Sequence, residues 1–200
     1  MGAWRQIAAL VLLFFCAWRP ISAATVEPRH LTEVRPLPRA LDPAFEFRKF
    51  KIFDLTAQAP RRSSFKGGED DQADPTGRRK IKSKAVTQEA SINFERSYRL
   101  FGAVTAYDQR QRQGEYFDFY WRAKRRSDIT VRFEYKQENL RAFTQAQELA
   151  YRDVRGTLHS AFRVTGDEYH DDGKVLAWRC LLVENGRIVA EKRSFLWERS

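Results

Sequence analysis

The sequence predicts an all-β fold, an antiparallel β-sandwich of about seven strands, in the chain that follows residue 85. All seven prolines lie at or before Pro75, and proline is excluded from sheet interiors because it cannot donate a ladder hydrogen bond. Beyond that point, runs of alternating apolar and polar residues recur at the spacing of sandwich strands. The glycines at 114, 156, 166, 173 and 186 lie between these runs or at their ends.

The clearest element is a β-hairpin between residues 175 and 197, in which two apolar-rich runs flank Glu184-Asn185-Gly186. Asn and Gly tolerate the positive φ angles that a tight strand reversal requires. We expect a three-residue loop, which places Cys180 opposite Ala190. A two-residue loop would place Cys180 opposite Glu191 instead.

The remaining strands are predicted from alternation in the earlier runs. They are expected at residues 98–108, 115–124, 129–136, 140–151 and 157–165, with a further start at 91–94. Residues 127–128 are expected to form a turn, as are residues 166–173. The run 140–151 also fits a helical stripe, and a strand is expected there because strands are predicted on both sides of it.

Residues 1–23 have the pattern of a secretory signal peptide. Arg5 supplies the positive start, and small residues at 22–24 suit cleavage. The apolar run from Ile7 to Trp18 is too short to span a membrane comfortably as a helix. A secreted or periplasmic protein is therefore expected, with no stable transmembrane span after cleavage; a retained N-terminal anchor is the alternative.

Residues 24–84 are predicted to be a Pro- and Arg-rich, largely disordered extension, because they carry too few large apolar groups to form a core. The exception is the aromatic segment 44–55, which we expect to dock on the domain as a short strand or apolar flap. Residues 85–200 would then form the β-sandwich domain.

The chain carries a formal charge of +10, which favours contact with polyanions. Its densest basic run is a candidate polyanion-binding segment, with a solvated linker as the alternative. The basic side chains of this run are Arg78, Arg79, Lys80, Lys82 and Lys84.

No residue pattern indicates catalysis, a metal site or a cofactor. Once the leader is removed, Cys180 would be the only cysteine, expected as a buried, inert thiol. None of the three histidines is placed beside a nucleophile, and no phosphate loop, G-x-S-x-G or H-E-x-x-H motif occurs. The acidic residues at 167–172 are interpreted as turn residues rather than cation ligands. We therefore expect a non-catalytic protein.

Four polar and aromatic side chains share the predicted outer face of the strand 115–124, and they form a candidate carbohydrate-binding surface. Flat aromatic rings beside hydrogen-bonding groups can stack on sugar rings. The alternative is that a second layer covers this face, since large apolar patches are uncommon on soluble monomers. The four residues are Tyr116, Asp118, Tyr120 and Arg122.

The strand spacing and the core Trp178-Arg179-Cys180 resemble fibronectin type III and immunoglobulin-like sandwiches over residues 85–198. Tyr169 resembles the tyrosine corner of such domains but is displaced, and the second cysteine of an immunoglobulin disulfide is absent. The whole chain is also similar to uncharacterised bacterial secreted proteins of this build. The resemblance implies an exported binding or structural protein with an unknown protein or cell-envelope partner. The strand edges and loops of the sandwich would contact that partner.

Overall fold

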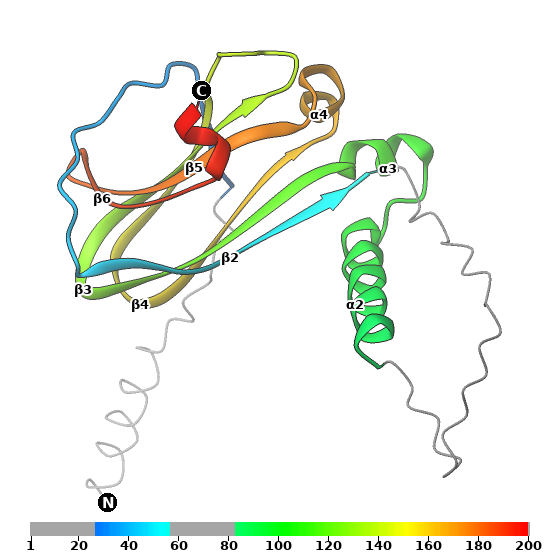
Figure 1. Ribbon diagram of the computed structural model, residues 1–200, viewed down its shortest axis with the longest axis horizontal. Coiled ribbons are helices and arrows are strands. Elements are labelled where there is room, and N and C mark those ends of the chain that lie inside the picture. Colours follow the sequence, from blue (N-terminus) through cyan, green and yellow to red (C-terminus); the bar gives the residue numbers. More distant parts are fainter. Residues whose placement is uncertain (1–26, 57–82, 200) are drawn as a thin grey trace, which may run out of the picture.

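The computed structural model describes residues 27–56 and 83–199, and these form a mainly antiparallel β structure (Figure 1). The predicted fold class, mainly β with antiparallel strands, is confirmed. The strands are β1 (Arg29–Leu31), β2 (Phe45–Leu55), β3 (Gly114–Gln137), β4 (Gln145–Thr165), β5 (Val175–Glu184) and β6 (Arg187–Arg193). The helices are α2 (Ser83–Leu100), α3 (Ala106–Arg112), α4 (Asp167–Asp172) and the 3-10 helix η2 (Phe195–Arg199).

The six described strands belong to one hydrogen-bonded sheet, built around the long pair β3 and β4. β4 occupies one edge of β3 along its length. The other edge of β3 is shared, because β2 pairs with residues 114–123 and β5 with residues 130–137. β6 extends the sheet beyond β5, and the short β1 pairs with β4.

Both long strands are irregular near their middles. The register of β3 shifts between Ala123 and Ile129, while Asp153 and Gly156 of β4 have positive φ. Such bulges bend a sheet, and the bend lets the two halves face a common core, with the Phe50 ring of β2 5.3 Å from the Trp178 ring of β5.

This bend corrects the predicted strand count and arrangement. Residues 127–128 and Gly156 were expected to separate strands, but they are irregular positions inside β3 and β4. Four predicted strands are therefore two continuous ones, and the described strands form one curled sheet rather than two separate sheets. The strand predicted at 140–151 is confirmed from Gln145 onward.

The core lies on the inner face of the curled sheet and is rich in aromatic rings. Phe133 is central, with its ring centroid 4.7 Å from Phe117 and 5.2 Å from Phe162. The Trp121 indole is fully buried and donates a 2.9 Å hydrogen bond to Ser160. Cys180 is also buried, as predicted, and burial raises the pKa of its thiol.

The aromatic segment expected to dock on the domain is β2, a full member of the sheet. Its apolar residues change phase in the sequence, and a bulge between Phe47 and Lys49 explains the change. The extra residue puts Phe50, like Phe45 and Phe47, opposite an inward-facing position of β3. Phe45 is buried in the core, whereas Phe50 stays 41% exposed beside Trp178.

Two predicted strands, at 91–94 and 98–108, are wrong, because these residues belong mostly to α2 and α3. A signal for α3 is present in the sequence. The Thr105 hydroxyl accepts from the Asp108 backbone N–H at 3.0 Å, and the Asp108 carboxylate accepts from the Thr105 N–H at 3.0 Å. This reciprocal capping box favours a helix start at Ala106 over a continuing strand.

The closing hairpin is confirmed, but the predicted three-residue loop is wrong. Asn185 and Gly186 both have positive φ and form a two-residue loop, with Glu184 paired to Arg187. A bulge then shifts the register, so that Lys192 rather than Glu191 lies opposite Cys180. Without the bulge, the Glu191 carboxylate would face the core.

The described part of the predicted extension is ordered against the sheet. Residues 38–42 follow β6, with the Ala40 N–H donating to the Ile188 carbonyl at 2.9 Å and the Asp42 N–H donating to the Val189 carbonyl at 3.0 Å. Leu37 packs on the outer face of the β5–β6 hairpin.

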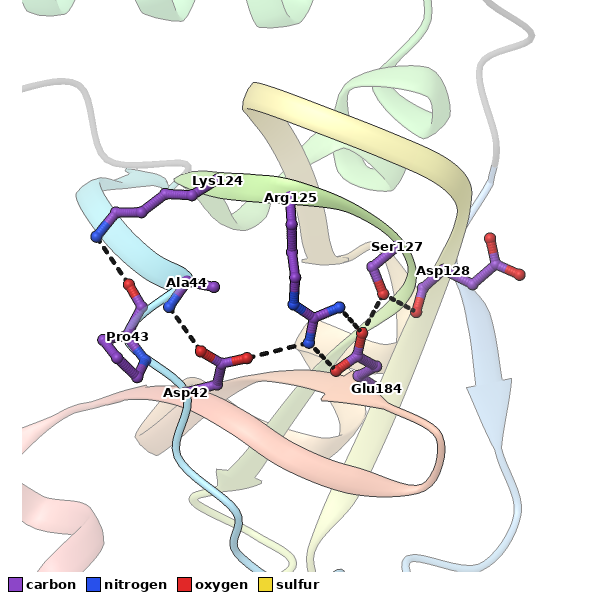
Figure 2. Close-up of polar contacts among 8 residues, drawn as sticks. All are labelled: Asp42, Pro43, Ala44, Lys124, Arg125, Ser127, Asp128 and Glu184. Atoms are coloured by element: carbon purple, nitrogen blue, oxygen red, sulfur yellow. Dashed lines mark hydrogen bonds and ion pairs between the residues drawn. The ribbon is translucent and has the colours of Figure 1, made fainter.

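An arginine joins this segment to the bend of β3. Figure 2 shows the Arg125 guanidinium between the carboxylates of Asp42 and Glu184, with distances of 3.0 Å and 2.5 Å. Arg125 also lies over the Phe45 ring, 4.6 Å from its centroid. The cluster therefore connects β2, β3 and the β5–β6 hairpin where β2 and β5 diverge along β3.

Candidate functional site

A groove of about 660 Å³ separates α2 from the outer face of the sheet, the face turned away from the core. Its sheet side is formed by β2, β3 and β4, which carry outward-facing side chains between the buried ones. The lining residues are Lys51, Ile52, Phe53, Ser91, Ile92, Glu95, Tyr98, Arg99, Asp118, Tyr120, His159 and Ala161. Polar and apolar groups therefore share one concave surface, as is usual in ligand sites.

A connected row of polar and aromatic groups forms the floor of the groove. The Asp118 carboxylate lies 2.9 Å from Nε2 of His159 and 3.3 Å from the Arg99 guanidinium. The His159 ring stacks on Tyr120, with 4.7 Å between centroids. Tyr120 and His159 are direct cross-strand partners, so the antiparallel register brings them together.

Arg99 fixes α2 over this floor. Its guanidinium lies 2.7 Å from the Glu95 carboxylate on the same helix and 4.1 Å from the centroid of the Tyr116 ring. The Tyr116 hydroxyl donates a 2.6 Å hydrogen bond to the Arg112 carbonyl, and burial raises the pKa of this phenol. Tyr116 therefore supports the wall of the groove and is not itself a lining residue.

The wall formed by α2 and the rim formed by β2 are more open. Tyr98 of α2 is 69% exposed and Ile92 is 47% exposed. Lys51 of β2 is exposed at the rim, directly opposite Asp118 in the β2–β3 register. The floor is thus hydrogen-bonded and stacked, while the rim offers aromatic, aliphatic and cationic groups to a ligand.

The four residues of the predicted carbohydrate-binding surface separate in the structure. Asp118 and Tyr120 line the groove, Tyr116 lies beneath Arg99, and Arg122 is exposed at a position paired with Glu46. The layer that lies over this outer face of the sheet is α2. The aromatic segment β2 is a strand of the sheet itself and does not cover the face. Sequence reasoning missed His159 because its partner Asp118 lies 41 residues away.

The basic run predicted to bind polyanions lies outside the described side chains. Arg78, Arg79, Lys80 and Lys82 precede the described helix, and Lys84 belongs to α2 without a described side chain. The acidic residues at 167–172, expected as a turn, form the short helix α4. Within residues 27–56 and 83–199, no group of three or more His, Cys, Asp or Glu side chains is placed to hold a metal ion.

A second hollow of about 510 Å³ lies between β1 and α4 and includes His30, Phe143 and Glu168. Burial raises the pKa of the Glu168 carboxyl, which accepts a hydrogen bond from the buried Tyr135 hydroxyl. Glu168 is thereby tied to the core, so the groove beside α2 is the stronger candidate site.

None of the helices described here is long and apolar enough to cross a membrane. Comparison of the chain with protein-family models, curated proteins and solved structures found no match. The functional assignment therefore depends on the chemistry of the groove.

Proposed function

We propose that the protein is an exported, non-catalytic binding protein whose ligand is a glycan held in the groove between α2 and the sheet. The observation that carries this proposal is the Asp118–His159–Tyr120 row on the groove floor. Sugar hydroxyls both donate and accept hydrogen bonds, which suits a carboxylate beside an imidazole. The C–H faces of a sugar ring are apolar and suit contact with aromatic rings.

The geometry supports a changed set of contact residues. The side chains expected to contact the ligand are Tyr120, Tyr98 and Asp118. Tyr116 is no longer among them, because Arg99 covers its ring. Lys51 at the rim adds a positive charge that favours an acidic sugar. Cell-wall glycans carry the chemical groups that these side chains would bind, and an exported protein would encounter them.

The test is binding of soluble peptidoglycan fragments and arrayed oligosaccharides to the full chain. Tyr98→Ala should weaken binding about tenfold, as truncation of a contact aromatic commonly does. Tyr107→Ala is the matched control, since Tyr107 is 68% exposed on α3 and Tyr98 is 69% exposed. Equal affinity of both variants and the unchanged protein would remove the groove as the glycan site.

A hydrolase is the second candidate, because Ser91, His159 and Asp118 line the same groove. These are the residue types of a serine hydrolase, in which the base bonds the nucleophile. Among the hydrogen bonds of the described residues, none joins Ser91 to His159. Release of cleaved sugar or ester that disappears in Ser91→Ala would establish hydrolysis; intact ligand recovered after binding supports the proposed role.

A further inference from the structure

Four large apolar side chains project from α2, α3 and the loop between them, and we name them the apolar tip. Phe94 is 71% exposed, Phe101 82%, Val104 84% and Tyr107 68%. They lie within 14 residues of sequence at one end of the sheet, where α2 and α3 stand beside the end of β2 (Figure 1). Soluble proteins rarely expose such a concentration of apolar surface without a binding role.

The Arg112 side chain and backbone hydrogen bonds fix the loop that carries the tip. Arg112 donates hydrogen bonds to the carbonyls of Phe101 and, at 3.2 Å, Arg99, and the Ala103 N–H donates to the Leu100 carbonyl at 2.9 Å. The capping box of Thr105 and Asp108 fixes the start of α3. These contacts fix the path of the loop backbone, while the Phe101 and Val104 side chains, which are 82% and 84% exposed, contribute little to the core.

The charge of the whole chain, +10, indicates what the tip meets. Residues 90–112 carry four arginines and two acids, and Asp118 and Asp167 pair with Arg99 and Arg110, so the attraction to an anionic surface comes from the whole chain rather than from the tip alone. A positive surface is attracted to anionic lipid head groups, and exposed aromatic and aliphatic side chains enter the boundary between head groups and acyl chains. A second copy of this chain would be repelled by the same charge.

We propose that the apolar tip docks on the surface of an anionic lipid bilayer. A nucleic acid would account for the arginines and the rings, but it offers no hydrocarbon for Val104. Tyr is enriched at membrane–water interfaces, and Phe is common on the apolar face of helices that lie in that interface. Since α2 carries the tip at its end and one wall of the groove along its side, docking would place the groove next to the membrane surface.

The first experiment measures cosedimentation of the full chain with vesicles of phosphatidylcholine and phosphatidylglycerol. The double variant Phe101→Ser with Val104→Ser should bind about tenfold or more weakly, because two inserting side chains are lost. The matched control is Phe143→Ser with Leu41→Ser, which removes side chains that are 59% and 68% exposed elsewhere on the molecule. Salt and pure phosphatidylcholine should each weaken binding of the unchanged protein.

A second readout locates the contact even if the N-terminal segment also binds lipid. In a Cys16→Ser background, an environment-sensitive dye at Val104→Cys should shift to the blue on vesicle addition, while the dye at Leu41→Cys should not. The buried Cys180 stays unlabelled in the folded protein. Equal responses of the two dyes, equal binding of the two double variants, or no vesicle binding by the unchanged protein would each overturn the proposal.

Discussion

Acidic side chains near the two ends of β2 lie in opposite surroundings. Just before its start, Asp42 shares the Arg125 guanidinium with Glu184 of β5 (Figure 2). The Ala44 backbone N–H and then Arg125 lower the pKa of Asp42, and Arg125 lowers that of Glu184. At its end, Asp54 and Glu115 are direct cross-strand partners, and burial raises the pKa of both carboxyls.

The contrast shows that the surroundings of a carboxylate in the folded protein decide whether its ionised form stabilises or destabilises the fold. The first pair stabilises the junction of three strands in its ionised form. The second pair carries a cost when ionised, because burial outweighs the attraction of Lys174 and, at Glu115, the hydrogen bond from the Val175 N–H. The two ends of one strand should therefore respond to pH in opposite directions.

The largest expected effect comes from removing the aromatic ring at the first end. Phe45→Ala should lower the free energy of unfolding by about 3–5 kcal/mol, since Phe45 is 3% exposed and also lies under Arg125. Denaturant unfolding would measure it. Phe143→Ala, at a 59% exposed site, is the control and should change stability little. Similar losses in both variants would show that β2 is not anchored there.

Replacing the shared cation should have a smaller effect with a distinct pH signature. A lowered carboxyl pKa contributes stability that is present above the ordinary values of 3.8 and 4.5 and is lost as pH falls through the folded values. Arg125→Met should therefore be less stable at neutral pH and lose less further stability below about pH 5. Urea denaturation across pH tests this, with Arg126→Met, whose described ion pair is exposed, as the control.

The smallest expected effect is a gain in stability at the second end. The raised pKa of Glu115 means that stability is full below its ordinary value of 4.5 and declines as pH rises through the folded value. Glu115→Gln removes this decline and keeps an oxygen for the Val175 N–H, which bonds the carboxylate at 2.6 Å. The variant should be more stable at neutral pH, whereas the exposed Glu138→Gln should not.

About half of the candidate site was accessible from the sequence. Asp118 and Tyr120 share a strand, and two-residue periodicity alone places them on one face, away from the buried Phe117 and Phe119. His159 could not be paired with Asp118, because that contact depends on the register between two strands far apart in sequence. Nor could Arg99, which reaches the site only because α2 folds over the sheet.

The sequence by itself determined the antiparallel β character and the Asn185-Gly186 reversal, because alternation and turn preference are set by neighbouring residues. Only the tertiary structure decided the bend that merges four predicted strands into two and the groove beside α2. These features depend on packing and pairing between distant residues.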